Sequence, residues 1–228
     1  MIEPSQIPLD FGHQPAFSEA DFLVASSNAE AHGWILRWPA WPALALGLWG
    51  PAGCGKSHLA HVFAARSGGV VVAARGFGTD DVPSLAEHPS VVVEDADRGV
   101  DEAAMFHLYN LLRETGRTLL VTGREAPARW GLRLPDLRSR LSSIPAVGIL
   151  APDDGLLQSL LLKLFADRQL RVGPDVLAYV LLRMERSFDA ARALVAAIDA
   201  AALARQRPVT VPLVREVMAD PTPDSDDR

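Results

Sequence analysis

The fold is decided by one stretch of eight residues, Gly50-Pro51-Ala52-Gly53-Cys54-Gly55-Lys56-Ser57. It fits the phosphate-binding pattern G-x-x-x-x-G-K-S, in which glycines let backbone N–H groups turn toward a phosphate chain. We expect the Lys56 ammonium to reach the β- and γ-phosphate oxygens, and the Ser57 hydroxyl to ligate Mg²⁺. The apolar run 43–49 predicts a strand that enters the loop, and residues 57–65 predict a helix that leaves it. This context predicts a nucleotide site.

Composition limits the other classes of function. The 228 residues, 49% of them hydrophobic, are enough for one α/β domain with a small helical addition. A net charge of −6 argues against a large nonspecific duplex-binding surface. We interpret the basic residues of 113–140 as a subunit interface or nucleotide site, and a local DNA-binding patch is the alternative. The single cysteine, Cys54, excludes an internal disulfide, and we expect it to fill space in the loop. No signal peptide or spanning segment is evident, so a cytoplasmic protein without a membrane partner is expected.

Periodicity predicts two folded regions between two tails. Apolar runs alternate with helical segments such as 101–114, which predicts an α/β fold with a parallel five-stranded sheet between helices; the further runs are 70–74, 91–93, 118–122 and the shorter 146–150. Asn28 is expected to cap an earlier helix. The period then becomes helical, in segments 153–168, 174–186, 189–205 and 212–218. We therefore expect a flexible tail at 1–15, an α/β nucleotide-binding domain at 16–151, a small all-α domain at 152–219 and a disordered acidic tail at 220–228.

Two carboxylates follow the third apolar run. Glu94 is placed to hold Mg²⁺ and Asp95 to polarise an attacking water, although a solvated acidic turn at a strand end has the same pattern. Asp is the usual residue at the metal-side position, so Glu94 departs from the expected order and Asp95 has a shorter reach. A displacement of about 1 Å can cost around a hundredfold in rate. We expect nucleotide binding with weak or no autonomous hydrolysis.

Two further side chains are candidates for work at the γ-phosphate. Thr122 ends the fourth apolar run, where it could sense this phosphate or orient water, and an ordinary strand-terminal threonine is the alternative. Arg140 is predicted on a short helix between the fourth and fifth strands. A guanidinium there can neutralise charge that develops on a neighbouring subunit's nucleotide, and a surface salt bridge is the alternative.

Together these motifs resemble the AAA+ ATPases. The stretch Gly55-Lys56-Ser57-His58-Leu59-Ala60-His61 is similar to that of the replication initiator DnaA, and Leu137-x-Ser139-Arg140 supports this branch. The resemblance implies a helical lid over the nucleotide and adds His58 to the nucleotide-binding residues. It also implies a sensor arginine on the third lid helix, where Asp189 stands near the expected position. We favour Arg192 over Arg186, and the alternative is that neither reaches the nucleotide. DnaA-type proteins carry a helix-turn-helix domain after the lid, whereas this sequence ends there, which favours a relative without one.

The first residues complete the resemblance. Gln6, Leu9 and Phe11 are similar to the Q-x-x-L-x-F peptide that docks on the β sliding clamp of DNA polymerase III. With the DnaA-like motifs, they resemble the Hda family of regulatory inactivators of DnaA. This resemblance implies an adaptor that holds ADP or ATP with Mg²⁺, meets DNA mainly through the clamp, and directs Arg140 at the ATP of DnaA. Homo-oligomerisation stays open. The alternative is a helicase loader or accessory replication ATPase, and the order of the acids disfavours an active motor.

Overall fold

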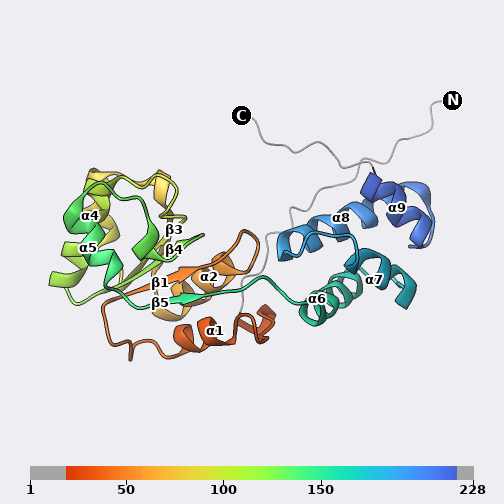
Figure 1. Ribbon diagram of the computed structural model, residues 1–228, viewed down its shortest axis with the longest axis horizontal. Coiled ribbons are helices and arrows are strands. Elements are labelled where there is room, and N and C mark those ends of the chain that lie inside the picture. Colours follow the sequence, from red (N-terminus) through yellow and green to blue (C-terminus); the bar gives the residue numbers. More distant parts are fainter. Residues whose placement is uncertain (1–18, 220–228) are drawn as a thin grey trace.

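The computed structural model describes residues 19–219, and its centre is one parallel sheet (Figure 1). The strand order is β2-β3-β4-β1-β5, with every neighbouring pair parallel. The strands are β1 (Ala45–Trp49), β2 (Val70–Ala73), β3 (Ser90–Glu94), β4 (Thr118–Gly123) and β5 (Ala146–Gly148). The predicted fold class is confirmed. The first strand starts later and the last ends earlier than predicted, because the apolar residues at those ends belong to loops.

Helices cover both faces of the sheet, as continuous apolar strands require. Alternate residues of β3 point to opposite sides: Val92 packs with α1 and α2, whereas Val91 and Val93 pack with α3, α4 and α5. These helices are α1 (Ala29–Leu36), α2 (Lys56–Ser67), α3 (Val82–Leu85), α4 (Glu102–Glu114) and α5 (Pro135–Ser142). Short 3-10 turns are η1 (Glu19–Asp21), η2 (Ala74–Gly76), η3 (Thr79–Asp81) and η4 (Pro127–Arg129). Among residues 19–219, none of the helices has the length and apolar content that crossing a membrane requires.

Four helices form a separate group beside the α/β layers (Figure 1). They are α6 (Asp154–Asp167), α7 (Pro174–Leu181), α8 (Phe188–Arg205) and α9 (Val211–Ala219). Their own core includes the buried side chains of Leu157, Phe165 and Val195. The second of these helices ends before the predicted residue 186, and Leu182, which had extended the apolar pattern, is 78% exposed.

The segment before α1 links the two groups of helices. Phe22 packs into the core under α1 and α2, while the next residue, Leu23, packs against the core of α6–α9. The carboxylate of Asp21 pairs with Lys163 of α6 at 2.7 Å. Asn28 lies at the start of α1 but makes no cap hydrogen bond, so that prediction was wrong. Its buried amide instead accepts from the N–H of Ala25 at 2.8 Å and donates to the Leu23 carbonyl at 2.9 Å. The amide fixes the turn of this linking segment.

Candidate functional site

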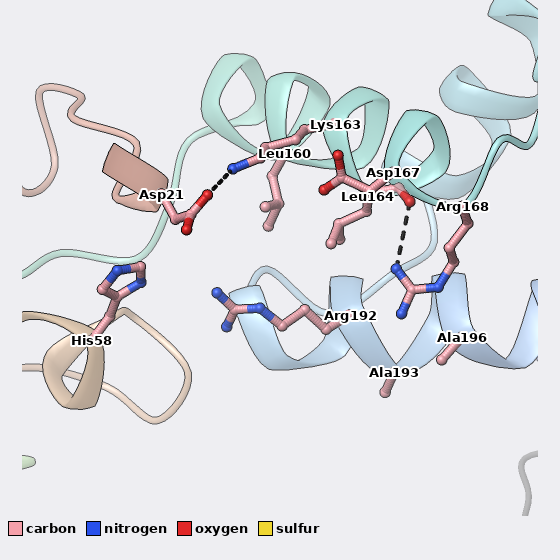
Figure 2. A pocket seen from close by; sticks show the side chains of 10 residues that line it. All are labelled: Asp21, His58, Leu160, Lys163, Leu164, Asp167, Arg168, Arg192, Ala193 and Ala196. Atoms are coloured by element: carbon pink, nitrogen blue, oxygen red, sulfur yellow. Dashed lines mark hydrogen bonds and ion pairs between the residues drawn. The ribbon is translucent and has the colours of Figure 1, made fainter. Parts of the chain in front are cut away.

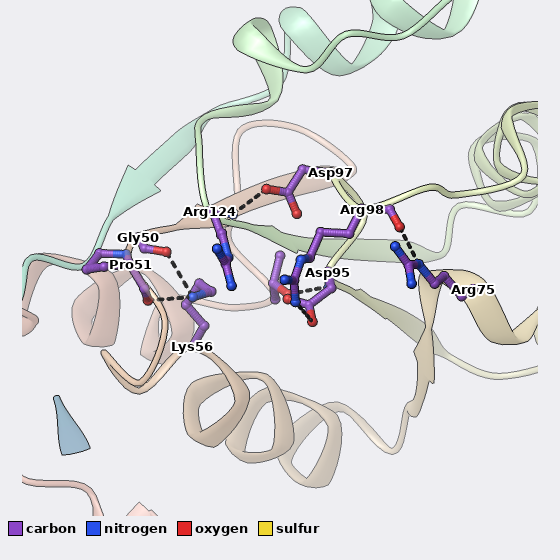
Figure 3. A network of polar contacts seen from close by, with 9 residues as sticks. Gly50, Pro51, Lys56, Arg75, Asp95, Asp97, Arg98 and Arg124 are labelled. Carbon is purple, nitrogen blue, oxygen red and sulfur yellow. Dashed lines mark hydrogen bonds and ion pairs between the residues drawn. The ribbon is translucent and has the colours of Figure 1, made fainter. Parts of the chain in front are cut away.

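The phosphate loop runs from the end of β1 to the start of α2. Gly53 and Gly55 have φ of 64° and 102°, values that favour glycine. Lys56 is only 8% exposed, and its ammonium donates to the carbonyls of Gly50 at 2.9 Å and Pro51 at 2.8 Å (Figure 3). The ammonium therefore faces the loop interior, where phosphate oxygens would compete with these carbonyls.

Cys54 has a packing role inside this loop. It is 1% exposed, and burial is the main cause that raises the pKa of its thiol above the ordinary value. Its sulfur lies 3.9 Å from the Lys56 nitrogen. Pro51 and Ala52 form the exposed outer side of the loop. A raised pKa makes a thiol less reactive at neutral pH, so this environment disfavours a redox role.

The group of helices α6–α9, which we call the lid, touches the tip of the loop through α8. The Phe188 N–H donates to the Gly53 carbonyl at 2.8 Å, across the two groups of helices. Ser187 is buried and caps α8, with its hydroxyl accepting from the N–H of Ala190 at 3.1 Å. A cavity of about 170 Å³, which we call the phosphate cavity, lies at this contact and is lined by Gly53, Gly55, Lys56, Ser57, His58, Asp189 and Arg192.

The two candidate sensor arginines lie in different places. Arg192 lines the phosphate cavity and pairs with Asp189 at 3.5 Å. Arg186 instead forms an exposed ion pair with Asp154 of α6 at 3.0 Å. Of the two, the structure brings Arg192 to the loop.

A larger cavity opens between α6 and α8 (Figure 2). It measures about 430 Å³ and includes Asp21, His58, Leu160, Leu164 and Arg192 in its lining. His58 is 6% exposed and packs edge-on against the Phe22 ring, with 5.2 Å between ring centroids. Sequence reasoning found His58 and Arg192 here but missed Asp21 and Leu160, as well as Phe22, which packs on His58. Asp21 and Phe22 gave no signal beyond an acid next to an apolar residue, far from any motif, and Leu160 is one of many apolar residues in the predicted helix 153–168.

Glu94, the last residue of β3, and Asp95, which follows it, share a cavity with Ser57. A cavity of about 280 Å³, the acid cavity, is lined by Ser57, Ala73, Ala74, Arg75, Glu94, Asp95 and Arg98. The Glu94 oxygen Oε1 is buried and has no hydrogen-bond partner among residues 19–219. A buried carboxylate oxygen of this kind is costly unless a cation or a proton joins it. Ser57 and Glu94 line one cavity and offer the oxygen ligands that Mg²⁺ prefers, so the residues fit this metal.

Asp95 is placed differently from Glu94. Its φ is 52°, in the left-handed region, and its carboxylate pairs with Arg98 at 3.8 Å (Figure 3). Arg75 supports this arrangement, because its Nε donates to the Arg98 carbonyl at 2.6 Å. Neither arginine was a sequence candidate, since arginines outside a motif carry no positional signal.

Thr122 is engaged with the backbone. It is 1% exposed, and its Oγ1 accepts from the Asp95 N–H at 3.0 Å, while its carbonyl accepts from the Ala96 N–H at 2.8 Å. Beyond it, the Asp97 carboxylate accepts from the Arg124 N–H at 2.7 Å, a contact that sequence reasoning missed. These bonds tie the carboxyl ends of β3 and β4 together, and the predicted sensing role of Thr122 has no direct support in them.

Arg140 lies on α5, the predicted short helix between the fourth and fifth strands. Its guanidinium lies over the rings of Phe106 at 4.7 Å and Tyr109 at 5.5 Å, and it donates to the Asn110 side chain. All three partners belong to α4, at the end of the α/β layers away from the lid (Figure 1). Arg140 lines none of the three cavities described above. The clamp-motif residues Gln6, Leu9 and Phe11 lie outside the described part of the chain.

The chain is similar to known proteins in its lid and in its fold. Residues 154–218 match the family model described as "Hda, lid domain". Domain III of the Thermotoga maritima replication initiation protein DnaA is 17% identical with a TM-score of 0.77, over 90% of this chain and 97% of that one. AMPPCP-bound DnaA from Aquifex aeolicus is 15% identical with a TM-score of 0.68, over 81% of this chain and 65% of that one.

The RuvB Holliday junction branch migration motor of Thermotoga maritima is also similar, with 16% identity and a TM-score of 0.71 over 89% of this chain and 71% of that one. At these identities the solved structures establish the fold alone, and the family model adds a match in the lid. The chain therefore has the fold of DnaA domain III and of RuvB, and its residues 154–218 match the Hda lid domain.

Proposed function

We propose that this chain is a nucleotide-bound regulator of replication initiation, which docks on the β sliding clamp and stimulates hydrolysis of the ATP held by DnaA. The observation that carries the proposal is the hydrogen bond from Phe188 to the Gly53 carbonyl. Through it, the Hda-like lid contacts the phosphate loop directly. The state of the nucleotide site can then set the position of the lid.

The nucleotide is ADP or ATP, with its phosphates at Lys56 and its base between α6 and α8. The cavity of about 430 Å³ has the size range of small-molecule sites, and Leu160 and Leu164 give it apolar walls. Mg²⁺, when bound, neutralises phosphate charge, and Ser57 with Glu94 would hold it. The solved DnaA of Aquifex aeolicus carries AMPPCP, which supports an adenine nucleotide here.

Hydrolysis by this chain itself is proposed to be weak. A general base must have a free carboxylate within hydrogen-bonding reach of the attacking water. The Asp95 carboxylate pairs with Arg98 at 3.8 Å, and the Thr122 hydroxyl accepts from the Asp95 backbone at 3.0 Å. The Asp95 carboxylate and the Thr122 hydroxyl therefore both stabilise the turn that follows β3. The nucleotide thus serves to fix a shape more than to be consumed.

Arg140 is proposed to act on the nucleotide of DnaA. Its guanidinium is held by aromatic stacking on Phe106 and by the Asn110 amide, on a helix outside the chain's own nucleotide cavities. A guanidinium that is already oriented loses less side-chain entropy when it meets a phosphate, and an arginine supplied to a partner's active site can raise hydrolysis by about 10³ to 10⁵.

Docking on the clamp is proposed from the Q-x-x-L-x-F residues Gln6, Leu9 and Phe11. Replacement of all three by alanine is expected to abolish binding to immobilised clamp while nucleotide affinity stays unchanged. Retained clamp binding would reject this part of the proposal.

The trans role of Arg140 is tested with Arg140→Ala and a matched control, Arg138→Ala. Both arginines lie on α5, but Arg138 is exposed and lies one half-turn away. In an assay of ATP-bound DnaA with clamp loaded on DNA, we expect the Arg140 variant to lose stimulation and the Arg138 variant to keep it. Nucleotide and clamp binding should be normal in both. Full stimulation by Arg140→Ala would contradict the trans role, and no stimulation by the unmodified protein would favour a helicase loader.

A further inference from the structure

A lid carboxylate stands at the phosphate loop. Asp189 is in the first turn of α8, directly after Phe188, whose N–H is bonded to the Gly53 carbonyl at 2.8 Å. The Asp189 oxygen Oδ2 lies 3.1 Å from the point where a Cβ on Gly53 would be. The backbone bond therefore holds an acidic side chain against the loop that receives phosphates.

The charges in the phosphate cavity are only partly favourable to an anion. Among its seven lining residues, Lys56 and Arg192 are the fixed cations and Asp189 is the anion. Asp189 pairs with Arg192 at 3.5 Å, so this pair contributes little net charge. Lys56 is left as the uncompensated fixed cation of the cavity. An incoming phosphate chain meets about half of the positive charge that two unpaired cations would provide.

The field of Asp189 also reaches the interior of the loop. Burial is the largest cause that raises the pKa of the Cys54 thiol, and the negative charge of Asp189 adds to that rise. Cys54 is two residues from Lys56, in the centre of the phosphate-binding stretch. A charge that disfavours a thiolate at this place disfavours phosphate anions there as well.

We propose that Asp189 is a specificity-determining residue of the nucleotide site, whose carboxylate lowers the affinity for each additional phosphate and so favours nucleoside diphosphates over triphosphates. This inference rests on the nucleotide site of the proposed function. Asp189 opposes the phosphates directly by charge, and it competes with them for the Arg192 guanidinium. A triphosphate carries one more negative charge than a diphosphate, so it meets more of this opposition.

The expected size of the effect is modest because the Asp189 side chain is 74% exposed and water screens it. Two unit charges about 7 Å apart in a water-like dielectric correspond to about a threefold change in an equilibrium constant. Removal of the Asp189 charge should therefore tighten diphosphate binding about threefold or more. It should tighten triphosphate binding by about a further threefold.

The test uses Asp189→Asn, which removes the charge at nearly constant size, and Asp199→Asn as a matched control. Asp199 is on the same helix, ten residues further from the loop, and is likewise ion-paired, with Arg168 at 3.7 Å. Ten residues of α-helix span about 15 Å, beyond the Debye length at physiological salt. Dissociation constants of fluorescent ADP and ATP are measured for the full chain with Mg²⁺, at about 0.1 M and about 1 M salt.

We expect Asp189→Asn to lower the ATP-to-ADP ratio of dissociation constants about threefold at low salt, and much less at high salt. Asp199→Asn and Asp189→Glu should keep the original ratio. Equal tightening of both nucleotides, or no change, would overturn the inference, since a purely structural role of Asp189 would leave the ratio constant. Failure of the unmodified protein to bind either nucleotide would overturn the proposed function and this inference together, whereas binding with unchanged selectivity in Asp189→Asn overturns this inference alone.

Discussion

Replacement of Gly53 by alanine should destabilise the protein through the contact between the phosphate loop and the lid. The φ of Gly53 is 64°, where a residue with a Cβ costs about 1–2 kcal/mol. The new Cβ would lie 2.9 Å from the Ser187 Cβ and 3.1 Å from the Asp189 carboxylate. Ser187 is buried, so it must shift, at a further cost of about 1–3 kcal/mol. We expect the free energy of unfolding to fall by about 2–5 kcal/mol in total.

The same chemical change at Gly33 is the matched control. Gly33 lies inside α1, and a Cβ there would have nothing within 4 Å. Alanine in a helix interior is about 0.5–1 kcal/mol more favourable than glycine, so Gly33→Ala should raise the free energy of unfolding. Urea unfolding followed by tryptophan fluorescence measures both changes, and a nucleotide titration should show weaker binding for the Gly53 variant alone. Changes of the same sign in the free energy of unfolding of the two variants would contradict a role of the Gly53 conformation and its contact with Ser187.

Three further substitutions and treatments test the packing around the site. Thr122→Val keeps the shape of the side chain but removes the acceptor of the Asp95 N–H. The free energy of unfolding, measured in urea, should therefore fall by about 1–3 kcal/mol, while that of Thr122→Ser should be close to the original value. Phe165→Ala empties a fully buried position of the lid core, and the same measurement should show a loss of about 3–5 kcal/mol; a loss below 1 kcal/mol would mean that the lid core is not packed there. Burial raises the pKa of the Cys54 thiol and covers it, so iodoacetamide at pH 8 should modify it far more slowly in the native protein than in urea. Equal rates would show that the loop is open.

Local patterns were sufficient to predict the fold. The phosphate-loop motif fixes a strand, a turn and a helix by itself, and strands that are apolar at every position, such as 91–93, are explained by helices on both faces of the sheet. The short helix that carries Arg140 was also predicted, at its place between the fourth and fifth strands. Each of these signals acts within a few residues of the chain.

Contacts between distant parts of the chain could not be predicted in this way. The bond from Phe188 to Gly53 depends on how the lid meets the loop, and no spacing rule joins these residues. Asn28 has the residue type and position of a helix cap, yet its side-chain amide bonds to the turn that precedes the helix. There it satisfies two backbone groups, the Ala25 N–H and the Leu23 carbonyl, in a segment that packs against the lid. The larger cavity between α6 and α8 was missed for a similar cause, since Asp21 and Leu160, which line it, come together only in the folded chain.

In the proposed function, hydrolysis occurs on the ATP of DnaA and not on the nucleotide of this chain. The most direct test loads DnaA with ATP labelled at the γ-phosphate and this protein with unlabelled ADP, then mixes them with clamp loaded on DNA and follows released labelled phosphate in a single turnover. We expect rapid release of labelled phosphate from DnaA, and loss of this release with Arg140→Ala. Release that stays at the rate of DnaA alone, or that occurs only when the label is placed on the nucleotide of this protein, would contradict it.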